Sequence, residues 1–514
     1  MTMTSNLFFR RLTSGITFDT KKFSKEASKF GLTKPDADVK LVEKERPVLP
    51  SIEEVKKEIK DKLKKEKQED VSDEDENDIT VLGNIKNTVK KKKKKKTKTK
   101  VKEVYEERLN QFRNANNLHV SGTDVPEPIS EWSMLSSRWN MSEQVVSCIT
   151  YPRPSAIQMQ TIPVMMAGRE LLACAPTGSG KTAAFLLPLI HQLREPRNGG
   201  YRAVVVVPTK ELAVQICNEC SALCAKNGLR PHMLSKVKAD KKASHQYQIS
   251  YKSDSFILST IYFLQVTVKH DILVSPPNRL VYMLQHDPPL LTLDKVEWLV
   301  VDEADKLFEA GETGFRDQLA AIHRACTGPG LRRAMLSATL GPEVEAWCKL
   351  NLDNMVRVRV GAANSATETI DQRLVYCGTE AGKLPAFRNL VKAGLQPPVL
   401  VFVQTKERAG ELFKELLYDG INVDVIHSER SEQQRENTVR AFRSGGIWVL
   451  ICTELMGRGI DFKGVNLVIN YDFPPSAVSY IHRIGRTGRA GRRGQAVTFF
   501  TEQDRTILRT IAQV

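Results

Sequence analysis

Short apolar runs rich in β-branched residues alternate with helical patterns along the chain from about residue 130 onward. Each run is continuous in its hydrophobicity, which is typical of strands buried on both faces of a parallel sheet that is covered by helices. The pattern therefore predicts an α/β fold with enough strands for two parallel sheets. The runs are Leu171 to Ala175, Ala203 to Val207, Trp298 to Val301, Met335 to Leu336, Val399 to Val403, Val423 to Ile426, Trp448 to Cys452, Leu467 to Asn470 and Ala496 to Phe500.

A stretch of small residues, Gly361 to Thr367, divides these runs into two groups and is suited to a flexible linker. We expect a first domain over residues 129–361, a linker over 362–372 and a second domain over 373–514, with a cleft between the domains. The sequence stops at Val514 within a helical pattern, and it leaves open whether the second domain is truncated.

Residues 1–128 differ in composition, with low hydrophobicity, an acidic block and an unbroken lysine run from Lys90 to Lys96. Such blocks cannot bury enough apolar surface to offset chain entropy, so we expect a mostly disordered, charged extension. The lysine run is compatible with a solvated tail, and the nucleic-acid-directed character of the body favours nuclear import or polyanion binding. The segment Phe8 to Arg11, with no acid before Asp19, also resembles a mitochondrial presequence, but Ser and Arg are not enriched further on.

The net charge of +16 attracts polyanions without choosing between RNA, DNA and anionic lipid. No run approaches the roughly 18 apolar residues of a membrane span, since polar residues break the longest candidate, Phe256 to Val268. Nine cysteines without a paired spacing argue against a disulfide framework. Cys217, Cys220 and Cys224 share one side of a helix, and core packing is favoured over a zinc site because a fourth ligand is missing.

A glycine-rich segment follows the first apolar run and precedes an apolar helical stretch, which is the context of a phosphate-binding P-loop. Backbone N–H groups there would face phosphates at a helix N-terminus, Lys181 would contact the β- and γ-phosphates, and Thr182 would contact Mg²⁺. The first position is Ala instead of Gly, so a plain glycine-rich turn is the alternative. The residues predicted to contact nucleotide are Ala175, Pro176, Thr177, Gly178, Ser179, Gly180, Lys181 and Thr182.

A second candidate site follows the run Trp298 to Val301, where Asp302, Glu303 and Asp305 come at the end of a predicted strand. Ligands of open α/β sheets bind at such carboxyl ends. Asp302 is then placed to hold Mg²⁺, and Glu303 to orient and deprotonate the attacking water. The alternative is an acidic helix N-cap cluster, against which the P-loop in the same domain argues.

Because residues 302–305 read Asp-Glu-Ala-Asp, the chain resembles the DEAD-box RNA helicases, and further motifs appear in that family's order. The resemblance implies two tandem RecA-like P-loop domains that bind ATP and Mg²⁺ between them and RNA across their shared face. The segment from Pro154 to Gln158 resembles the Q motif, in which Gln158 would read the adenine edge. Trp132 stands where the family has an aromatic residue that stacks on adenine.

The remaining roles follow from the same resemblance. Ser337 and Thr339 resemble motif III, which with Asp305 couples the nucleotide state to the grip on RNA. The octapeptide from His482 to Arg489 matches motif VI, so guanidinium groups crossing the cleft would stabilise the γ-phosphate. A solvated basic helix face is the alternative for this string. By resemblance the arginine fingers are Arg486 and Arg489, the RNA contacts are Pro208, Thr209, Lys210, Arg279, Arg435, Thr453 and Arg458, and Asp461 contacts the nucleotide.

Four positions depart from the family pattern, all on the expected RNA side: Lys210 for Arg, Pro276 for Thr, Glu432 for Gln and Glu454 for Asp. Glu432 adds a negative charge beside phosphates, so we expect weaker RNA binding with ATP chemistry retained. The segment 255–268 lies in a stretch longer than usual, and the sequence leaves open whether it is an insertion or a gene-model artefact.

Finer features, among them the segments Val120 to Pro126 and Gly168 to Cys174, resemble the Rok-type nucleolar branch of the family. This resemblance implies a role in rRNA processing and small-ribosomal-subunit assembly, in the nucleus and nucleolus, with pre-rRNA or a small nucleolar RNA as client. We expect a monomeric motor without a membrane partner, whose protein activators and ribosome-assembly partners the sequence does not name. The alternatives are a non-hydrolysing RNA-binding scaffold and a DNA-directed motor of the same architecture.

Overall fold

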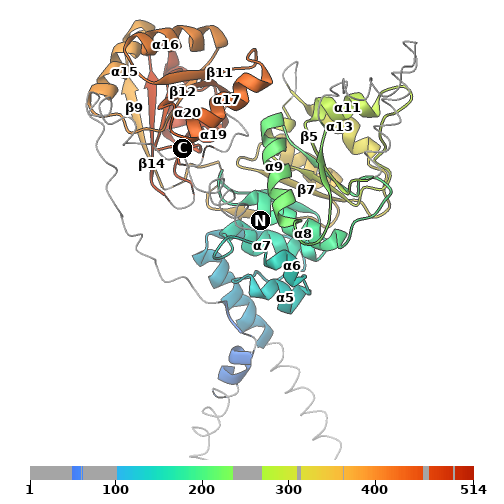
Figure 1. Ribbon diagram of the computed structural model, residues 1–514. Coiled ribbons are helices and arrows are strands. Elements are labelled where there is room, and N and C mark those ends of the chain that lie inside the picture. The colour runs from blue at the N-terminus through green and yellow to red at the C-terminus, as the bar shows by residue number, and fades with distance from the viewer. Residues whose placement is uncertain are drawn as a thin grey trace, which may run out of the picture.

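The protein is described here by a computed structural model that covers residues 49–51, 53–59, 61, 101–234, 269–309, 314–362, 364–367, 369–454, 462, 464–489 and 492–514. These residues form two lobes, each built on its own sheet (Figure 1). The lysine run, the segment 255–268, Arg458 and Asp461 lie outside the described residues, so the expectations for them stay predictions. Within the described part, no helix combines the length and the apolar character that a membrane span requires.

The first lobe contains an eight-stranded sheet in which every neighbouring pair is parallel except β1 and β8. Adjacent strands pair residue by residue; for example, Leu171 lies opposite Ala334. In spatial order the strands are β1 (Leu118–Ser121), β8 (Val356–Val360), β2 (Leu171–Cys174), β7 (Arg332–Ser337), β6 (Trp298–Val301), β3 (Ala203–Val206), β5 (Ile272–Ser275) and β4 (Pro231–Met233).

Successive side chains of a strand point to opposite faces of the sheet, so buried strands of this kind have two apolar faces. Helices cover both of them. Val205 packs in one hydrophobic cluster, with residues of α7, α8 and α9, and Val204 packs in another, with residues of α11, α13 and α14. The helices of the lobe are α5 (Ser133–Trp139), α6 (Glu143–Val146), α7 (Ala156–Met166), α8 (Lys181–Leu193), α9 (Lys210–Leu223), α11 (Pro277–Leu284), α12 (Ala304–Leu307), α13 (Arg316–Ala325) and α14 (Pro342–Asn351).

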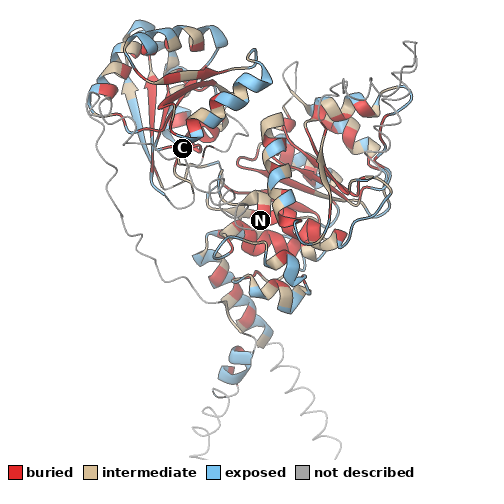
Figure 2. Ribbon diagram, viewed as in Figure 1, coloured by how far each residue is buried: buried red, intermediate tan, exposed pale blue. Residues whose placement is uncertain are grey.

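The second lobe contains a fully parallel six-stranded sheet whose central strands are buried, whereas the edge strand β9 is largely exposed (Figure 2). The strand order is β11 (Val423–Ile426), β12 (Val449–Thr453), β10 (Val399–Val403), β13 (Leu467–Asn470), β14 (Gly494–Phe500) and β9 (Ile370–Tyr376). The helices are α15 (Lys383–Lys392), α16 (Lys406–Tyr418), α17 (Glu432–Arg443), α19 (Ala477–Ile484) and α20 (Arg505–Ala512), with the short 3₁₀ turns η2 (Glu380–Gly382) and η3 (Glu502–Asp504).

The predicted α/β class with two parallel sheets is confirmed, and each predicted apolar run forms a strand. The sequence analysis did not find β1, β4, β5, β8 and β9. Strands β1, β4 and β9 lie at sheet edges, and β8 and β9 carry charged residues among their apolar ones, so none of these four reads as a continuous apolar run. Strand β5 follows directly on the unusual segment before Ile272, which hid its short apolar stretch.

Within the extension that was expected to be mostly disordered, residues 53–59 and 101–128 are described as folded, so the folded part begins earlier than residue 129. Residues 101–115 form a helix whose Tyr105 and Leu109 pack on Val55 and Ile59, while Phe112 is buried in the first-lobe core. These apolar residues recur at helical spacing but are diluted by charged neighbours, so the average composition concealed them. Strand β1, which pairs with β8, also belongs to the first lobe.

The predicted linker is shorter and more firmly held than expected. Strand β8 ends at Val360 and β9 begins at Ile370, so residues 370–372 belong to the second sheet. Asn364, within the linker, accepts a hydrogen bond from the Leu340 N–H at 2.9 Å and donates one to the Leu340 carbonyl at 3.3 Å. The linker is therefore tied to the first lobe just beyond β7.

Candidate active site

Three functional segments of the first lobe meet at the carboxyl end of its sheet. The glycine-rich loop follows β2, Asp302 follows β6, and Ser337 ends β7, which lies between those two strands. Strands β3 and β5 lie next along the same edge and are followed by Thr209 and Arg279. The strand order therefore places the predicted phosphate and metal residues beside one another, with the predicted RNA residues on the adjacent strands.

The glycine-rich loop has the backbone conformation of a phosphate-binding loop at the start of α8. Gly178 and Gly180 have φ values of 74° and 91°, in the left-handed region that favours glycine. A Cβ added at Gly180 would lie 2.5 Å from the Gln158 Nε2, so a side chain there would displace Gln158. The Lys181 ammonium donates to the Ala175 carbonyl at 2.6 Å and to the Pro176 carbonyl at 3.1 Å, which holds it over the loop.

Asp302 and Glu303 lie opposite this lysine in a desolvated environment. Burial raises the pKa of Asp302 to about 7, against the opposing effect of the Lys181 charge. Burial likewise lowers the pKa of Lys181, and the nearby Asp302 opposes that shift. The Asp302 Oδ1 accepts a hydrogen bond from the Glu303 N–H at 2.9 Å. The lysine and aspartate therefore each favour the charged form of the other at neutral pH.

Glu303 has two features that are unusual for a structural residue. Its φ of 52° lies in the left-handed region, which is strained for a residue other than glycine. Its carboxylate Oε2 is buried and has no hydrogen-bond partner among the described residues, as is also true of the Ser179 Oγ in the glycine-rich loop. Buried, unpartnered oxygens at such a place indicate groups that are satisfied by a ligand or by water.

These residues fit a nucleoside triphosphate and its magnesium ion. The loop supplies backbone donors and a lysine for phosphates, and two oxygens near it lack protein partners. Thr182 and Asp302 supply the hydroxyl and carboxylate oxygens that Mg²⁺ prefers. Among the described residues no cluster of three or more His, Cys, Asp or Glu could hold a metal by itself. Cys220 and Cys224 instead lie in the first-lobe core, with Cys217 packed against it.

The two residues predicted to recognise adenine hold the neighbouring backbone. Gln158 accepts from the Ser155 N–H at 2.8 Å through Oε1 and donates to the Gly180 carbonyl at 3.0 Å through Nε2. One further donor and one further acceptor position of this amide remain for a base. The Trp132 indole donates to the Tyr151 carbonyl at 2.8 Å and packs on the first-lobe core. Gln158 thus links the predicted adenine pocket to the phosphate loop directly.

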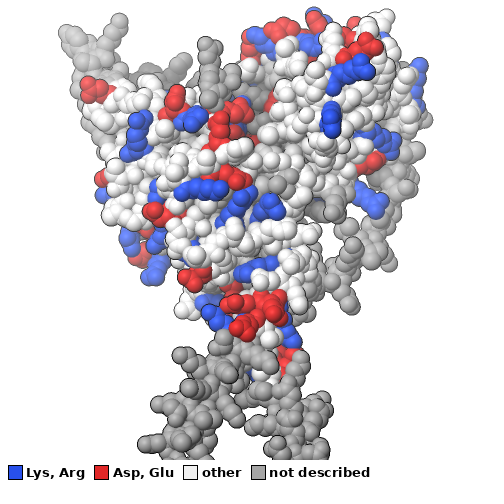
Figure 3. All heavy atoms as spheres, turned by 180° about the vertical axis from the view of Figure 1, so that it is seen from behind, with Lys and Arg blue, Asp and Glu red and all other residues white. Residues whose placement is uncertain are grey.

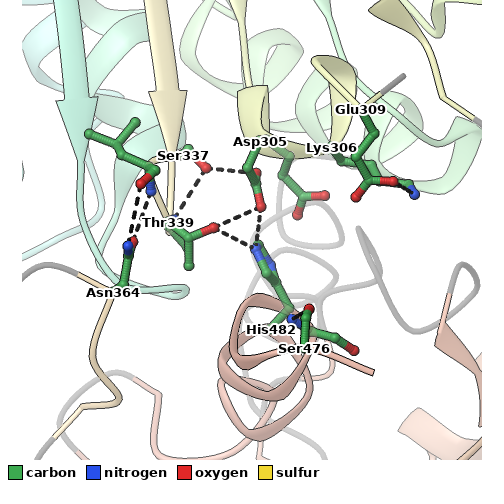
Figure 4. Close-up of polar contacts among 12 residues, drawn as sticks. Asp305, Lys306, Glu309, Ser337, Thr339, Asn364, Ser476 and His482 are labelled. Atoms are coloured by element: carbon green, nitrogen blue, oxygen red, sulfur yellow. Dashed lines mark hydrogen bonds and ion pairs between the residues drawn. The ribbon is translucent and has the colours of Figure 1, made fainter. Parts of the chain in front are cut away.

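A hydrogen-bonded group joins the lobes at Asp305 (Figure 4). The Asp305 carboxylate accepts from the Ser337 hydroxyl at 2.6 Å and from the Thr339 hydroxyl at 2.9 Å. Its Oδ2 also lies 2.6 Å from the Nε2 of His482, which belongs to α19 of the second lobe. The residues predicted to couple nucleotide state to RNA grip are therefore in direct contact with the predicted motif VI.

The phosphate loop also contacts motif VI. The Thr177 hydroxyl donates to the Gly485 carbonyl at 2.8 Å. A Cβ added at Gly178 would lie 2.9 Å from the Arg489 Cγ, so the Arg489 side chain lies against the loop. Arg489 donates through Nε to the Gly485 carbonyl at 2.9 Å, and the buried Arg486 donates through Nε to the His482 carbonyl at 3.1 Å. Arg489 is thus on the side of the second lobe that faces the loop.

The predicted RNA residues of the first lobe are distributed along the sheet edge. Pro208 and Thr209 precede α9, and the Thr209 hydroxyl caps this helix by accepting from the Leu212 N–H at 3.3 Å. Arg279, on α11, lies over the Tyr282 ring at 5.3 Å from its centroid. Lys210, at the start of α9, pairs with a carboxylate of the second lobe, Glu432.

The second lobe supplies Thr453, which ends β12, and Arg435 of α17. Arg435 donates through Nε to the Glu211 carboxylate of the first lobe at 3.1 Å. Glu454, which was expected on the RNA side, accepts from the Ser479 hydroxyl at 2.6 Å and pairs with Arg483 at 3.0 Å, so it holds motif VI within its own lobe.

Sequence analysis assigned no role to three residues that connect the lobes. His482 lay within the quoted motif VI, and its position there was the available signal. Asn364 was read as part of a flexible linker, and its side-chain bonds to Leu340 could not be inferred from composition. Glu211 follows Lys210 directly, and its pairing with Arg435 depends on how the lobes face one another.

On one face of the protein, surface charge does not mark out a nucleic-acid site. On the face shown in Figure 3, Lys and Arg side chains are interspersed with Asp and Glu. A mixed face produces no single-sign field of the kind that steers a polyanion. The RNA assignment therefore depends on the particular residues at the sheet edge.

Comparison with known proteins agrees with this geometry. The family model for the DEAD/DEAH box helicase matches residues 155–347, and the model for the helicase conserved C-terminal domain matches residues 382–491. "Probable ATP-dependent RNA helicase DDX52" of Rattus norvegicus is 49% identical over 100% of this chain and 89% of its own length. The chain belongs to the DEAD-box helicase family.

Other relatives of this DEAD-box helicase span the same two lobes. "ATP-dependent RNA helicase ROK1" of Kluyveromyces lactis is 42% identical, over 79% of this chain and 68% of its own length. The solved structure of S. cerevisiae Dbp5 bound to RNA and ADP BeF3 matches with a TM-score of 0.62 and 26% identity, over 74% of this chain and 92% of that one. The fold and the arrangement of the lobes are therefore those of a DEAD-box helicase.

Replacing Lys181 by Ala in this helicase is expected to weaken ATP binding by about 100-fold, because a charge-assisted contact to phosphate is lost and the pKa of Asp302, no longer lowered by the Lys181 charge, rises further. Titration with a fluorescent ATP analogue measures the affinity, and circular dichroism checks that the variant is folded. Lys226→Ala removes a lysine from the same lobe that donates to Ser147, and is expected to bind like the parent. An unchanged affinity for Lys181→Ala would contradict the assignment of the loop.

Proposed function

We propose that this protein is an ATP-dependent RNA helicase that binds RNA and unwinds or remodels short duplexes through ATP hydrolysis. The observation that carries the proposal is the contact of one lobe's phosphate loop and Asp305 with the other lobe's motif VI. Two lobes that share a nucleotide site can couple hydrolysis to the relative position of the lobes, and hence to any RNA bound across both.

The residues divide the hydrolysis between them. Lys181 and the loop N–H groups would bind the phosphates, and Thr182 and Asp302 would hold Mg²⁺, which neutralises phosphate charge when bound. Glu303, with its unpartnered Oε2, would orient the attacking water and accept its proton. Arg486 and Arg489 would neutralise charge that develops on the transferred phosphoryl group. Hydrolysis then requires both lobes.

RNA would cross both lobes at Thr209, Lys210 and Arg279 on one side and Arg435 and Thr453 on the other. Contacts from these groups to phosphates position the strand and carry no sequence information. The client RNA is then chosen by other parts of the chain or by partner proteins. Small-ribosomal-subunit assembly in the nucleolus, with pre-rRNA or a small nucleolar RNA as client, is our proposal for the context. It is supported by the Rok-type sequence features and by the ROK1 relatives.

An ATPase assay titrated with RNA tests the proposal on the full-length chain. We expect single-stranded RNA to stimulate turnover by at least about tenfold, since RNA bound across both lobes would favour the arrangement in which they share the nucleotide. Duplex RNA with a short overhang should be separated only when ATP is present. The same titration with double-stranded DNA serves as the control.

Two outcomes would reject this function. The non-hydrolysing scaffold would be favoured if the protein binds RNA but hydrolyses no ATP, whether or not RNA is present in the ATPase assay. Equal stimulation by double-stranded DNA and by RNA would favour the DNA-directed motor.

A further inference from the structure

Two helix N-termini face each other across the gap between the lobes. Helix α9 of the first lobe begins with Lys210 and Glu211, and helix α17 of the second lobe begins with Glu432. The Lys210 ammonium forms an ion pair with the Glu432 carboxylate. One helical turn further along α17, Arg435 pairs with Glu211 at 3.1 Å. In these two ion pairs, each helix contributes one cation and one anion.

The two bridges differ in their access to solvent. The Lys210 and Glu432 side chains are 29% and 46% exposed, whereas those of Arg435 and Glu211 are 18% and 26% exposed. An ion pair in contact with water contributes little to stability and exchanges partners readily. The Lys210–Glu432 pair is therefore the one that a competing anion can open.

RNA supplies such a competing anion at this place. Lys210 follows β3, next to the strand that precedes Arg279, and both cations lie where the RNA backbone is proposed to run. A phosphate and a carboxylate compete for the same ammonium. Glu432 is on the opposite lobe, so its bond to Lys210 spans the gap that RNA would also span.

Resting on the function proposed above, we propose that Glu432 competes with RNA phosphate for Lys210, and that the Lys210–Glu432 pair holds the lobes together until RNA replaces it. Removing the Glu432 carboxylate should therefore raise the affinity for RNA and lower the turnover without RNA. RNA binds more tightly because Lys210 is available without displacing a partner. Turnover without RNA falls because one link between the lobes is gone.

The variant Glu432→Gln tests both consequences in the full-length protein. We expect the RNA concentration for half-maximal ATPase to fall by about fivefold and RNA-free turnover to fall by about threefold, the size set by one partly exposed pair. The salt dependence of RNA binding should steepen by about one phosphate contact. A merely structural role for Glu432 would lower turnover without tightening RNA binding.

The matched control is Glu436→Gln, which removes the same charge one turn later on α17. Glu436 is exposed and forms no ion pair with any residue that the structure describes. It reports the general effect of one less negative charge near RNA, which we expect to stay within about twofold.

The second variant is Lys210→Gln, alone and combined with Glu432→Gln. In the Lys210→Gln background, Glu432→Gln should change neither RNA binding nor RNA-free turnover by more than the Glu436→Gln control. Such non-additivity separates the pair from general electrostatics and remains informative if either single variant is less stable.

The proposal is overturned if Glu432→Gln binds RNA no more tightly than Glu436→Gln, or if its effect persists without Lys210. These results are distinct from failure of the proposed function, in which the parent protein itself would show no stimulation by RNA. The comparison of the variants requires only that RNA stimulates ATP turnover by the parent protein.

Discussion

Glu303→Gln is expected to lower RNA-stimulated ATP turnover by about 10³-fold while ATP affinity stays within about twofold of the parent. Glutamine has nearly the same shape as glutamate but cannot accept a proton. The Glu303 Oε2 is buried without a hydrogen-bond partner among the described residues, so its replacement by an amide nitrogen removes no protein contact. The loss should therefore fall on the chemical step.

Single-turnover hydrolysis of radiolabelled ATP at saturating RNA measures this step, and nucleotide titration measures binding in parallel. Glu343→Gln is the matched control, because Glu343 lies on α14 of the same lobe and, among the residues that the structure describes, forms an ion pair only with Arg316, which is exposed. Its turnover should equal that of the parent. Equal turnover in Glu303→Gln and the parent would reject Glu303 as the base.

The first lobe shows how far local sequence patterns reach. The runs that became β2, β3 and β6 are continuous and apolar, and each is followed by polar residues whose role depends on the end of the strand. The rule that ligands bind at carboxyl ends of parallel strands then groups the P-loop with Asp302 and Glu303. The site could be predicted because its residues are local to their strands.

What the sequence could not supply are features set by the relation between distant segments. Helix 101–115 was missed because its buried Phe112 stands among polar residues. Val55, on which other residues of this helix pack, is far away in the chain. The adenine-reading role predicted for Gln158 took no account of its bonds to Ser155 and Gly180.

The ion pairs between the lobes also depend on segments that are far apart in the sequence. Lys210 and Arg435 were predicted as RNA contacts from the motifs that contain them, but each also faces a carboxylate of the opposite lobe. No spacing within one motif encodes a neighbour in another domain. The unusual Glu432 was noticed in the sequence, and only the structure supplied its partner.

The second large effect is expected at Arg489. Its side chain lies against Gly178 of the phosphate loop and is oriented by a 2.9 Å bond from its Nε to the Gly485 carbonyl. A guanidinium that reaches the transferred phosphoryl group from another domain contributes about 10³-fold or more to turnover. We therefore expect Arg489→Ala to lose about 10³-fold in turnover, and Arg489→Lys, which keeps the charge but not the planar fork, to recover only part of it.

The control for this variant is Arg493→Ala, which removes an exposed arginine near the start of β14 in the same lobe. We expect its ATP turnover to match the parent. Circular dichroism and RNA-free nucleotide binding verify that Arg489→Ala is folded and retains the first-lobe site.

Single-turnover ATP hydrolysis by Arg489→Ala, with the enzyme in excess over ATP and at saturating RNA, tests most directly whether one lobe completes the nucleotide site of the other. A rate about 10³-fold below that of the parent, with nucleotide binding retained, is the result that a shared site predicts. A rate within about twofold of the parent would mean that the first lobe hydrolyses ATP without Arg489 of the second, and would contradict the role assigned to this arginine.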